Sequence, residues 1–265
     1  MRTIRLTLQY DGTEYVGWQR QAAGTSIQGL LEDALLPIEG QRVVVHGAGR
    51  TDAGVHALAQ EASCRLNAAI DPHTLARALN AVLPLDLRVT AAAEMEADFH
   101  ARFSSTGKVY EYRILNGRYA SPFLRRYALH VAPALDLDAM REGSAVLVGT
   151  HDFSAFQGTG SDVHTAVRTV RRCEWRPGNG PDAPIVFEIE GDGFLRHMVR
   201  NIAGTLLDVG LGRRPPAEMA AILASGQRAR AGNTAPPHGL FLQKVLYGGN
   251  LERPPDPPVS SQVSL

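Results

Sequence analysis

The sequence predicts an α+β protein made of two ferredoxin-like (split βαβ) halves, each with an antiparallel sheet, joined around a central cleft. Three observations support this prediction. Strand-like and helix-like segments follow one another in the order β-α-β-β-α-β in both halves of the chain. The length of 265 residues suits about two domains. The composition, 44% hydrophobic and 20% charged, provides enough apolar residues for two cores.

The first half supplies four predicted strands and two predicted helices. Apolar and polar residues alternate over residues 4–10, which is typical of a half-buried strand. Residues 26–40 carry an apolar stripe at helical spacing. A second helix is predicted to begin at Pro72, capped by Asp71, and to end at Val82. The other strands of this half are predicted over residues 41–47, 57–66 and 86–95.

The second half repeats this order without a close sequence repeat. Its strands are predicted over residues 108–116, 166–176, 185–191 and 240–248, and its helices over residues 136–149, 194–212 and 216–225. We therefore predict an N-terminal domain over residues 1–105 and a C-terminal domain over residues 106–247. Residues 248–265 are rich in Pro and Ser, which predicts a disordered tail.

Composition limits the functions that remain open. Basic and acidic residues number 27 each, so the net charge does not by itself indicate nucleic-acid binding, and such binding would depend on local clusters. The two cysteines show no metal-ligand spacing, so we expect no metal site. The N-terminus lacks the pattern of a secretory signal, and no apolar run is long enough to span a membrane. We expect a cytoplasmic protein with no membrane partner.

The segment HGAGRTDAGVHA, residues 46–57, is the strongest candidate for a functional loop. A phosphate-binding P-loop would need Lys and Ser or Thr where Val55 and His56 stand. A dinucleotide-binding turn would need a third glycine where Asp52 stands. A plain turn remains open. However, Arg50 and His56 flank Asp52 next to a strand, where scaffolds commonly display functional groups, so Asp52 is a candidate attacking carboxylate.

The helix predicted over residues 194–212 carries two arginines four positions apart. Arg196 and Arg200 are expected on one face, one turn apart and away from the apolar stripe. In one interpretation, one of these arginines pairs with a carboxylate and the other with a phosphate. In the alternative, both belong to a basic face that is exposed to solvent. Gly204 continues the same face and permits another backbone to approach closely.

Aromatic and basic residues of the second half have two interpretations each. Tyr110 and Tyr112 share one face of the predicted strand 108–116, where they are either core residues or a stacking platform for a nucleobase. Arginines gather over residues 168–176 and at 125–126, where they either form a solvated surface or contact a phosphate backbone.

Four segments together resemble the TruA family of tRNA pseudouridine synthases. They are GWQRQ at residues 17–21, GAGRTDAGVHA at 47–57, DFHARFSSTGKVYEYRI at 98–114 and FLRHMVRNIAGTLLDVG at 194–210. The resemblance extends from Met1 to about Gly248 in the same order, and GRTDAGVHA is its most specific part. Phe241 is a departure, because tyrosine is expected there.

The resemblance implies the pseudouridine synthase fold and an isomerase that converts uridine to pseudouridine in the anticodon stem-loop of tRNA, just 3′ of the anticodon. It also implies a homodimer, no cofactor and no metal. Asp52 corresponds to the catalytic aspartate, Tyr110 to an aromatic residue that stacks on the target base, and Arg200 to the ion-pair partner of Asp52. Leu240 corresponds to an apolar wall of the pocket, and Arg50 to an arginine that helps to hold the flipped-out nucleotide.

The residues suit this chemistry. The reaction breaks the N-glycosidic bond, turns the uracil and rejoins the sugar to C5, so nothing is added or lost. The aspartate either attacks C1′ as a nucleophile or removes the 2′ proton as a general base, and the sequence leaves both routes open. Burial favours a neutral carboxyl group and a neighbouring guanidinium favours the anion, so an arginine such as Arg200 is required. The alternative function is a non-catalytic RNA-binding module, which gives the Arg50–Asp52 loop no role.

Overall fold

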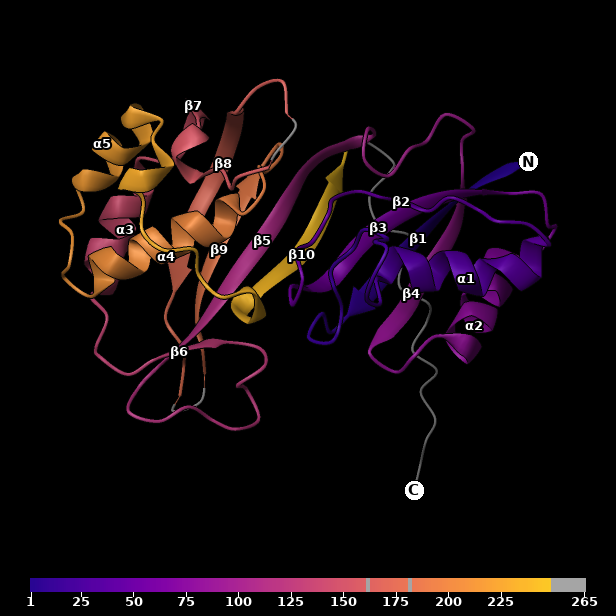
Figure 1. The fold of residues 1–265 in the computed structure, drawn as a ribbon, viewed down its shortest axis with the longest axis horizontal. Helices are drawn as coiled ribbons and strands as arrows, with labels where there is room; N and C mark the ends of the chain where they lie inside the picture. The colour runs from indigo at the N-terminus through magenta and orange to yellow at the C-terminus, as the bar shows by residue number, and fades with distance from the viewer. Residues whose placement is uncertain (161–162, 181–182, 249–265) are drawn as a thin grey trace.

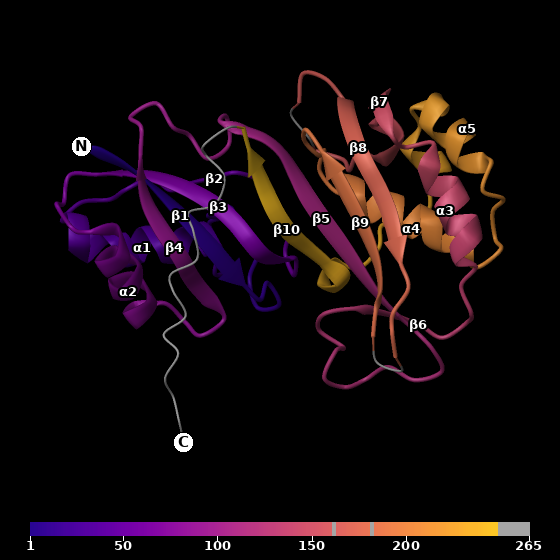
Figure 2. The same cartoon turned by 180° about the vertical axis from the view of Figure 1, so that it is seen from behind.

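The computed structural model describes residues 1–160, 163–180 and 183–248, and in this part of the chain one ten-stranded sheet passes through both halves. Its main order is β4-β1-β3-β10-β5-β9-β8-β7, with β2 beside β3 and β6 beside β5. The helices of both halves pack on the same face of this sheet, and the opposite face is open to view in Figure 2 (Figures 1 and 2). The predicted α+β class is confirmed.

The N-terminal half contains β1 (Arg2–Tyr10), α1 (Ile27–Glu39), β2 (His46–Gly47), β3 (His56–Leu66), α2 (Pro72–Val82) and β4 (Leu87–Met95). β1 pairs antiparallel with β3 and β4, and β2 pairs antiparallel with β3, which gives the ferredoxin-like order 4-1-3-2. The side chain of Ser26 caps α1, and Gly40 ends this helix with a φ of 74°. Asp71 caps α2 as predicted.

The C-terminal half has the same plan. Its elements are β5 (Ser105–Asn116), β6 (Leu129–Val131), α3 (Leu137–Ala145), β7 (Gly149–Asp152), β8 (Val167–Arg176), β9 (Ile185–Gly191), α4 (Met198–Gly210), α5 (Glu218–Ser225) and β10 (Leu240–Tyr247). The order β10-β5-β9-β8 repeats the order 4-1-3-2 of the first half. Three short 3₁₀ helices complete it: η1 (Ser154–Phe156), η2 (Arg228–Arg230) and η3 (Pro237–Gly239).

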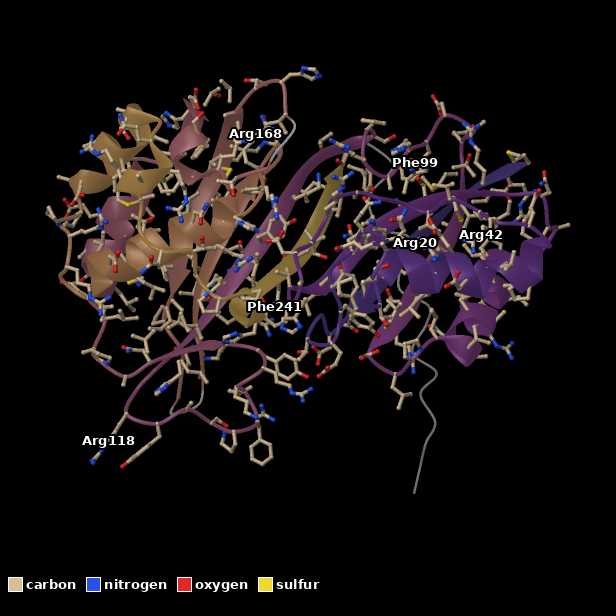
Figure 3. All side chains as sticks on the ribbon, in the orientation of Figure 1. Arg20, Arg42, Phe99, Arg118, Arg168 and Phe241 are labelled. Atoms are coloured by element: carbon tan, nitrogen blue, oxygen red, sulfur yellow. The ribbon has the colours of Figure 1, made fainter. Side chains whose placement is uncertain are left out.

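The last strand, β10, joins the two halves. It runs antiparallel to β5 along its length and makes a short parallel contact with β3, where Phe241 lies beside His56. The Phe241 ring stacks on the His56 ring at 4.6 Å and lies 3.8 Å from the Arg113 guanidinium carbon on its other side. Figure 3 shows Phe241 where β10 begins, between the two halves. The sheet is therefore continuous through the region that holds the candidate loop.

Several predicted elements are shorter than expected. The strand predicted over residues 41–47 is reduced to β2, because the Val45 backbone bonds to side chains of α1: its carbonyl accepts from Gln28 and its N–H donates to Glu32. The helix predicted over residues 136–149 ends at Ala145.

The helix predicted from residue 194 begins only at Met198, because His197 adopts a φ of 59° and interrupts it. The sequence pattern also missed β6 and β7.

The predicted domain boundary, between residues 105 and 106, falls at the start of β5 and stays a prediction. Of the predicted tail, residues 249–265 lie outside the described part of the chain. Within the described residues, no helix is both long and apolar enough to cross a membrane.

Candidate active site

The structure brings together two predicted site residues that are 148 positions apart. Asp52 lies on the loop between β2 and β3, and its Oδ2 accepts a hydrogen bond from Nη1 of Arg200, on α4, at 3.0 Å. The Asp52 side chain is 31% exposed and that of Arg200 is 13% exposed, so the pair lies at the edge of the core and remains accessible. Each half therefore supplies one partner of the ion pair.

The loop around Asp52 is held by residues of the first strand and of the segment that follows it. The carbonyl of Thr51 accepts the N–H of Trp18 at 3.0 Å, and its hydroxyl lies 2.8 Å from that of Tyr10. Gly17 has a φ of 107°, and a Cβ there would lie 2.6 Å from the Thr51 carbonyl oxygen. The GWQRQ segment thus packs directly beneath the Asp52 loop, which only glycine at position 17 permits.

His56, which the sequence places near Asp52, supports the loop instead of reaching the carboxylate. Its Nδ1 accepts the N–H of Gly12 at 3.0 Å, its Nε2 lies 2.9 Å from the Arg126 carbonyl oxygen, and the residue is 1% exposed. Burial lowers the pKa of His56, and the nearby Asp11 carboxylate opposes this effect without cancelling it. A neutral ring that accepts at Nδ1 and donates from Nε2 fits both contacts.

Arg200 is fixed from a second side. Its Nε donates to the Ala235 carbonyl at 2.8 Å, and its own carbonyl accepts the N–H of Ala235 at 3.1 Å. One turn later, a Cβ on Gly204 would lie only 1.8 Å from the Asn233 carbonyl oxygen. The predicted close approach at Gly204 is confirmed, and it presses the segment before β10 against α4 beside Arg200.

Arg196 does not share the face of Arg200, and that prediction was wrong. Arg196 precedes α4 because the chain turns at His197, and its Nη1 donates to the carbonyls of Thr159 and Gly160 at 2.8 and 3.3 Å. The guanidinium is therefore drawn away from Asp52, and the two arginines serve different neighbours.

The predicted aromatic and apolar residues lie on the strands beside this pair. Tyr110, on β5, is 7% exposed and meets the Phe194 ring edge-on at 5.2 Å. Burial raises the pKa of Tyr110, and the nearby Tyr10 and Asp52 raise it further. Leu240 begins β10 and is 6% exposed. It pairs with Tyr112, two residues along β5 from Tyr110.

Arg50 is exposed, and its side chain makes no hydrogen bond or ion pair within the described ranges. It is therefore available to an external partner.

Sequence reasoning missed one residue of the site, His197. Its Nε2 lies 3.5 Å from Oδ2 of Asp52, so the imidazole and the Arg200 guanidinium approach the same carboxylate oxygen. Burial lowers the pKa of His197; Asp52 acts in the opposite direction, and Arg200 and other arginines add to the lowering. The signal available in the sequence was a histidine three positions before Arg200, inside the quoted motif.

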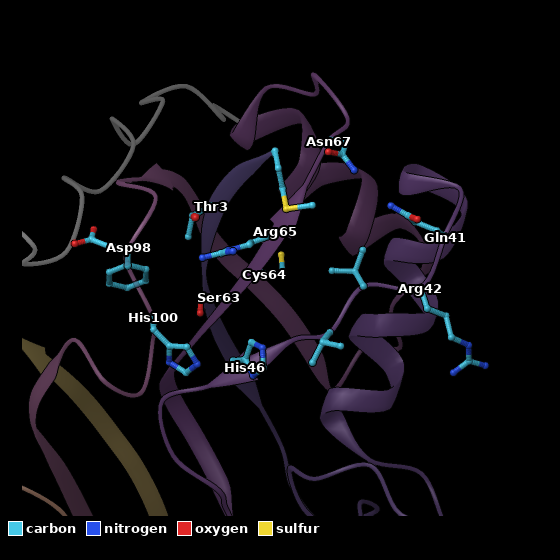
Figure 4. A pocket seen from close by; sticks show the side chains of 14 residues that line it. Thr3, Gln41, Arg42, His46, Ser63, Cys64, Arg65, Asn67, Asp98 and His100 are labelled. Atoms are coloured by element: carbon cyan, nitrogen blue, oxygen red, sulfur yellow. The ribbon is translucent and has the colours of Figure 1, made fainter.

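The other predicted features lie elsewhere. On β8, Arg172 and Arg176 pair with Glu188 at 2.7 and 2.9 Å, so these arginines belong to an ion-pair network across the sheet. A cavity of about 530 Å³ lies in the N-terminal half, lined by residues that include His46, Cys64 and His100 (Figure 4). Neither Asp52 nor Arg200 is among its lining residues, so the ion pair lies outside this cavity.

The arrangement pairs the Asp52 carboxylate with a guanidinium at hydrogen-bond distance. Arg200 and His197 both approach Oδ2 of Asp52, and no described residue forms a hydrogen bond to Oδ1. Oδ1 is thus the oxygen that can act as a nucleophile or as a base.

The chain is similar in sequence to a family of known proteins over most of its length. A model of the tRNA pseudouridine synthase family matches residues 7–104 and 144–248. The chain is 47% identical over 247 residues to tRNA pseudouridine synthase A of Myxococcus xanthus, covering 93% of this chain and 92% of that protein. It is 46% identical over 257 residues to the protein of the same name from Solidesulfovibrio magneticus, covering 94% and 92%. It is 42% identical over 247 residues to that of Acetivibrio thermocellus, covering 93% and 100%.

Proposed function

This chain belongs to the tRNA pseudouridine synthase family and isomerises uridine to pseudouridine in tRNA, and within that activity we propose that Asp52 is the catalytic carboxylate. The observation that carries the proposal is the ion pair between Asp52 and Arg200 at 3.0 Å, on a loop and a helix from different halves. We further propose that the target uridine lies in the anticodon stem-loop, just 3′ of the anticodon.

The ion pair explains how one carboxylate serves the reaction. When the substrate covers the site and excludes water, the Arg200 guanidinium stays paired with the Asp52 carboxylate. Oδ1 then attacks C1′ or removes the 2′ proton, and in either route uracil leaves as a delocalised anion. The uracil turns and C5 bonds to C1′; this step breaks the ester bond between Asp52 and C1′ in the first route and returns the 2′ proton to the sugar in the second. C5 then loses its proton and N1 gains one, so nothing is added or lost. No redox partner or group donor is required, so we propose that the enzyme uses no cofactor and no metal.

The neighbouring residues suit the retention of free uracil. Tyr110 is buried near Asp52, and Leu240 is buried on the adjacent strand β10. A ring there can stack on the base and an aliphatic side chain can exclude water. The target nucleotide must leave its stack, at a cost of a few kcal/mol. Arg50 is exposed and free to contact a phosphate, and such a contact offsets part of that cost.

We propose that the enzyme acts as a homodimer, on the basis of the sequence motifs quoted above. We also propose that it acts in the cytoplasm, where its substrate is found. Sedimentation of the purified protein tests the homodimer, since a monomer at working concentrations contradicts it.

The test of the catalytic assignment is Asp52→Asn. This variant keeps the size and most of the hydrogen bonding of the side chain but cannot act as an anion. We expect no pseudouridine after incubation with unmodified tRNA transcripts, mapped chemically, while tRNA binding measured by filter retention persists. Full turnover by the variant would refute the assignment, and the mapped position tests the anticodon stem-loop at the same time.

A further inference from the structure

His197 combines two features found together nowhere else in the described part of the chain. It is the one described non-glycine residue with a positive φ, 59°, and its ring reaches the carboxylate of Asp52. A positive φ is uncommon for a residue other than glycine, and such strain gathers at functional sites. It has a clear structural effect: Arg196 and His197 form a turn, and α4 starts directly after it at Met198, so that Arg200 in the first turn of the helix bonds to Asp52.

The ring of His197 is held on both sides. Nε2 lies 3.5 Å from Oδ2 of Asp52, and a Cβ built on Gly158 would lie 2.7 Å from Nδ1. Gly158 is itself fixed, because its N–H donates to the Arg196 carbonyl at 2.8 Å. The imidazole therefore sits between a backbone wall and the carboxylate, with little room to turn.

We propose that His197 is a positioning residue for the reaction: together with Arg200 it anchors Oδ2 of Asp52, so that Oδ1 is left aimed at the ribose. This inference rests on the proposed catalytic role of Asp52. A carboxylate held by Arg200 alone can rotate about its Cβ–Cγ bond and exchange its two oxygens, whereas a second contact on the same oxygen opposes that exchange. Misplacement of a reacting group by about 1 Å can cost a hundredfold in rate.

The His197 ring is neutral at neutral pH, and its Nε2 faces Oδ2 of Asp52 as an N–H donor. Burial and the surrounding arginines Arg196, Arg200 and Arg228 lower the pKa of His197, and only Asp52 acts in the other direction. At 3.5 Å the contact is longer than a normal hydrogen bond. Such contacts commonly shorten when the substrate completes the site. A neutral donor positions the carboxylate without neutralising its charge.

Two substitutions at this position separate the ring's role from that of the backbone. Gly tolerates positive φ, so His197→Gly preserves the start of α4. Gln places an amide N–H where Nε2 of the imidazole lies and can still donate toward Oδ2, whereas Gly cannot. Gly158→Ala is a third variant that leaves His197 unchanged and displaces its ring. Gly117→Ala is its control, because a Cβ at Gly117 meets nothing within 4 Å.

The experiment measures kcat and KM for an unmodified tRNA transcript, with the thermal unfolding midpoint of each variant. We expect kcat of His197→Gly and Gly158→Ala to fall by about tenfold to a hundredfold with KM unchanged, and His197→Gln to recover most of this loss. The inference is overturned if His197→Gly keeps the wild-type kcat, or if Gln and Gly, with equal unfolding midpoints, lose kcat equally. Asp52→Asn is assayed alongside: activity there defeats the proposed function, whereas an inactive Asp52→Asn with a fully active His197→Gly defeats only this inference.

Discussion

At the scale of single residues, two side chains approach Oδ2 of Asp52: Nη1 of Arg200 at 3.0 Å and Nε2 of His197 at 3.5 Å. Asp52 and Arg200 were predicted as partners from their motifs, and they meet at 3.0 Å. His56 lies four positions after Asp52, yet it turns into the core to bind Gly12. His197 was overlooked, because a left-handed histidine leaves no signature in a pattern of apolar and polar residues.

The two arginines of the long motif offer a test at this scale. Arg200→Met removes the charge opposite Asp52 and is expected to lower kcat by about tenfold to a hundredfold, since a hydrogen bond to a charged group contributes roughly 1.5–3 kcal/mol. Arg196→Met is the matched control, because its guanidinium binds the carbonyls of Thr159 and Gly160. Steady-state assays with tRNA compare the two. Equal losses would contradict the geometry described here.

At the scale of elements, periodicity predicted which segments are helices and strands and failed at their ends. α1 and α2 begin at the residues that their caps indicate, because Ser26 and Asp71 are local signals. The start of α4 is set by the left-handed backbone of His197, and the neighbouring Arg196 carbonyl accepts the N–H of the distant Gly158, a contact that no local pattern contains. The strand predicted over residues 41–47 was shortened to β2 for a similar reason, since side chains of α1 satisfy the Val45 backbone.

The packing of α4 provides the prediction for this scale. Gly204→Ala is expected to destabilise the protein by about 1–3 kcal/mol, because its Cβ would overlap the Asn233 carbonyl oxygen at 1.8 Å and one backbone must move. Urea denaturation measures the change. Gly117→Ala, with open space around its Cβ, is expected to change stability by no more than about 0.5 kcal/mol. A neutral Gly204→Ala would show that α4 and the segment before β10 do not pack as described.

At the scale of the whole molecule, the sequence predicted two similar halves but not the way they join. The pattern of residues 240–248 indicates a strand, and a strand pattern carries no information about its neighbours. In the structure β10 lies between β5 and β3, with only Phe241 and Leu242 in register with β3. This short parallel contact is the product of long-range packing around Phe241 and His56.

Phe241 is the residue whose loss would reveal the coupling of the halves. Phe241→Ala removes a ring that is 4% exposed and packed between His56 and Arg113, at an expected cost of about 3–5 kcal/mol. Calorimetry should show a lower midpoint. Phe103→Ala, at a position 75% exposed, serves as the control with little change. A wild-type midpoint in Phe241→Ala would mean that the junction contributes nothing to stability.

Acid should weaken the same junction. The pKa of His56 is lowered in the folded protein, so between the usual value of 6.5 and the lowered one the unfolded chain binds more protons at this position. The free energy of unfolding is therefore expected to fall as the pH drops below about 6.5, and the loss ends below the folded pKa. Urea titrations at a series of pH values measure the slope, and His56→Gln should have a shallower one. An equal slope in both proteins would exclude His56 as a source.

The position of β10 has a consequence for newly made enzyme. A ribosome that has translated the first half has already produced the loop that carries Asp52, but the guanidinium that partners it comes 148 residues later. The strand that ties both halves follows later still, as the last strand of the described residues. We therefore expect a nascent polypeptide to hold the Asp52 carboxylate without its counter-ion until α4 has been made, and to lack the junction of the two halves until β10 follows.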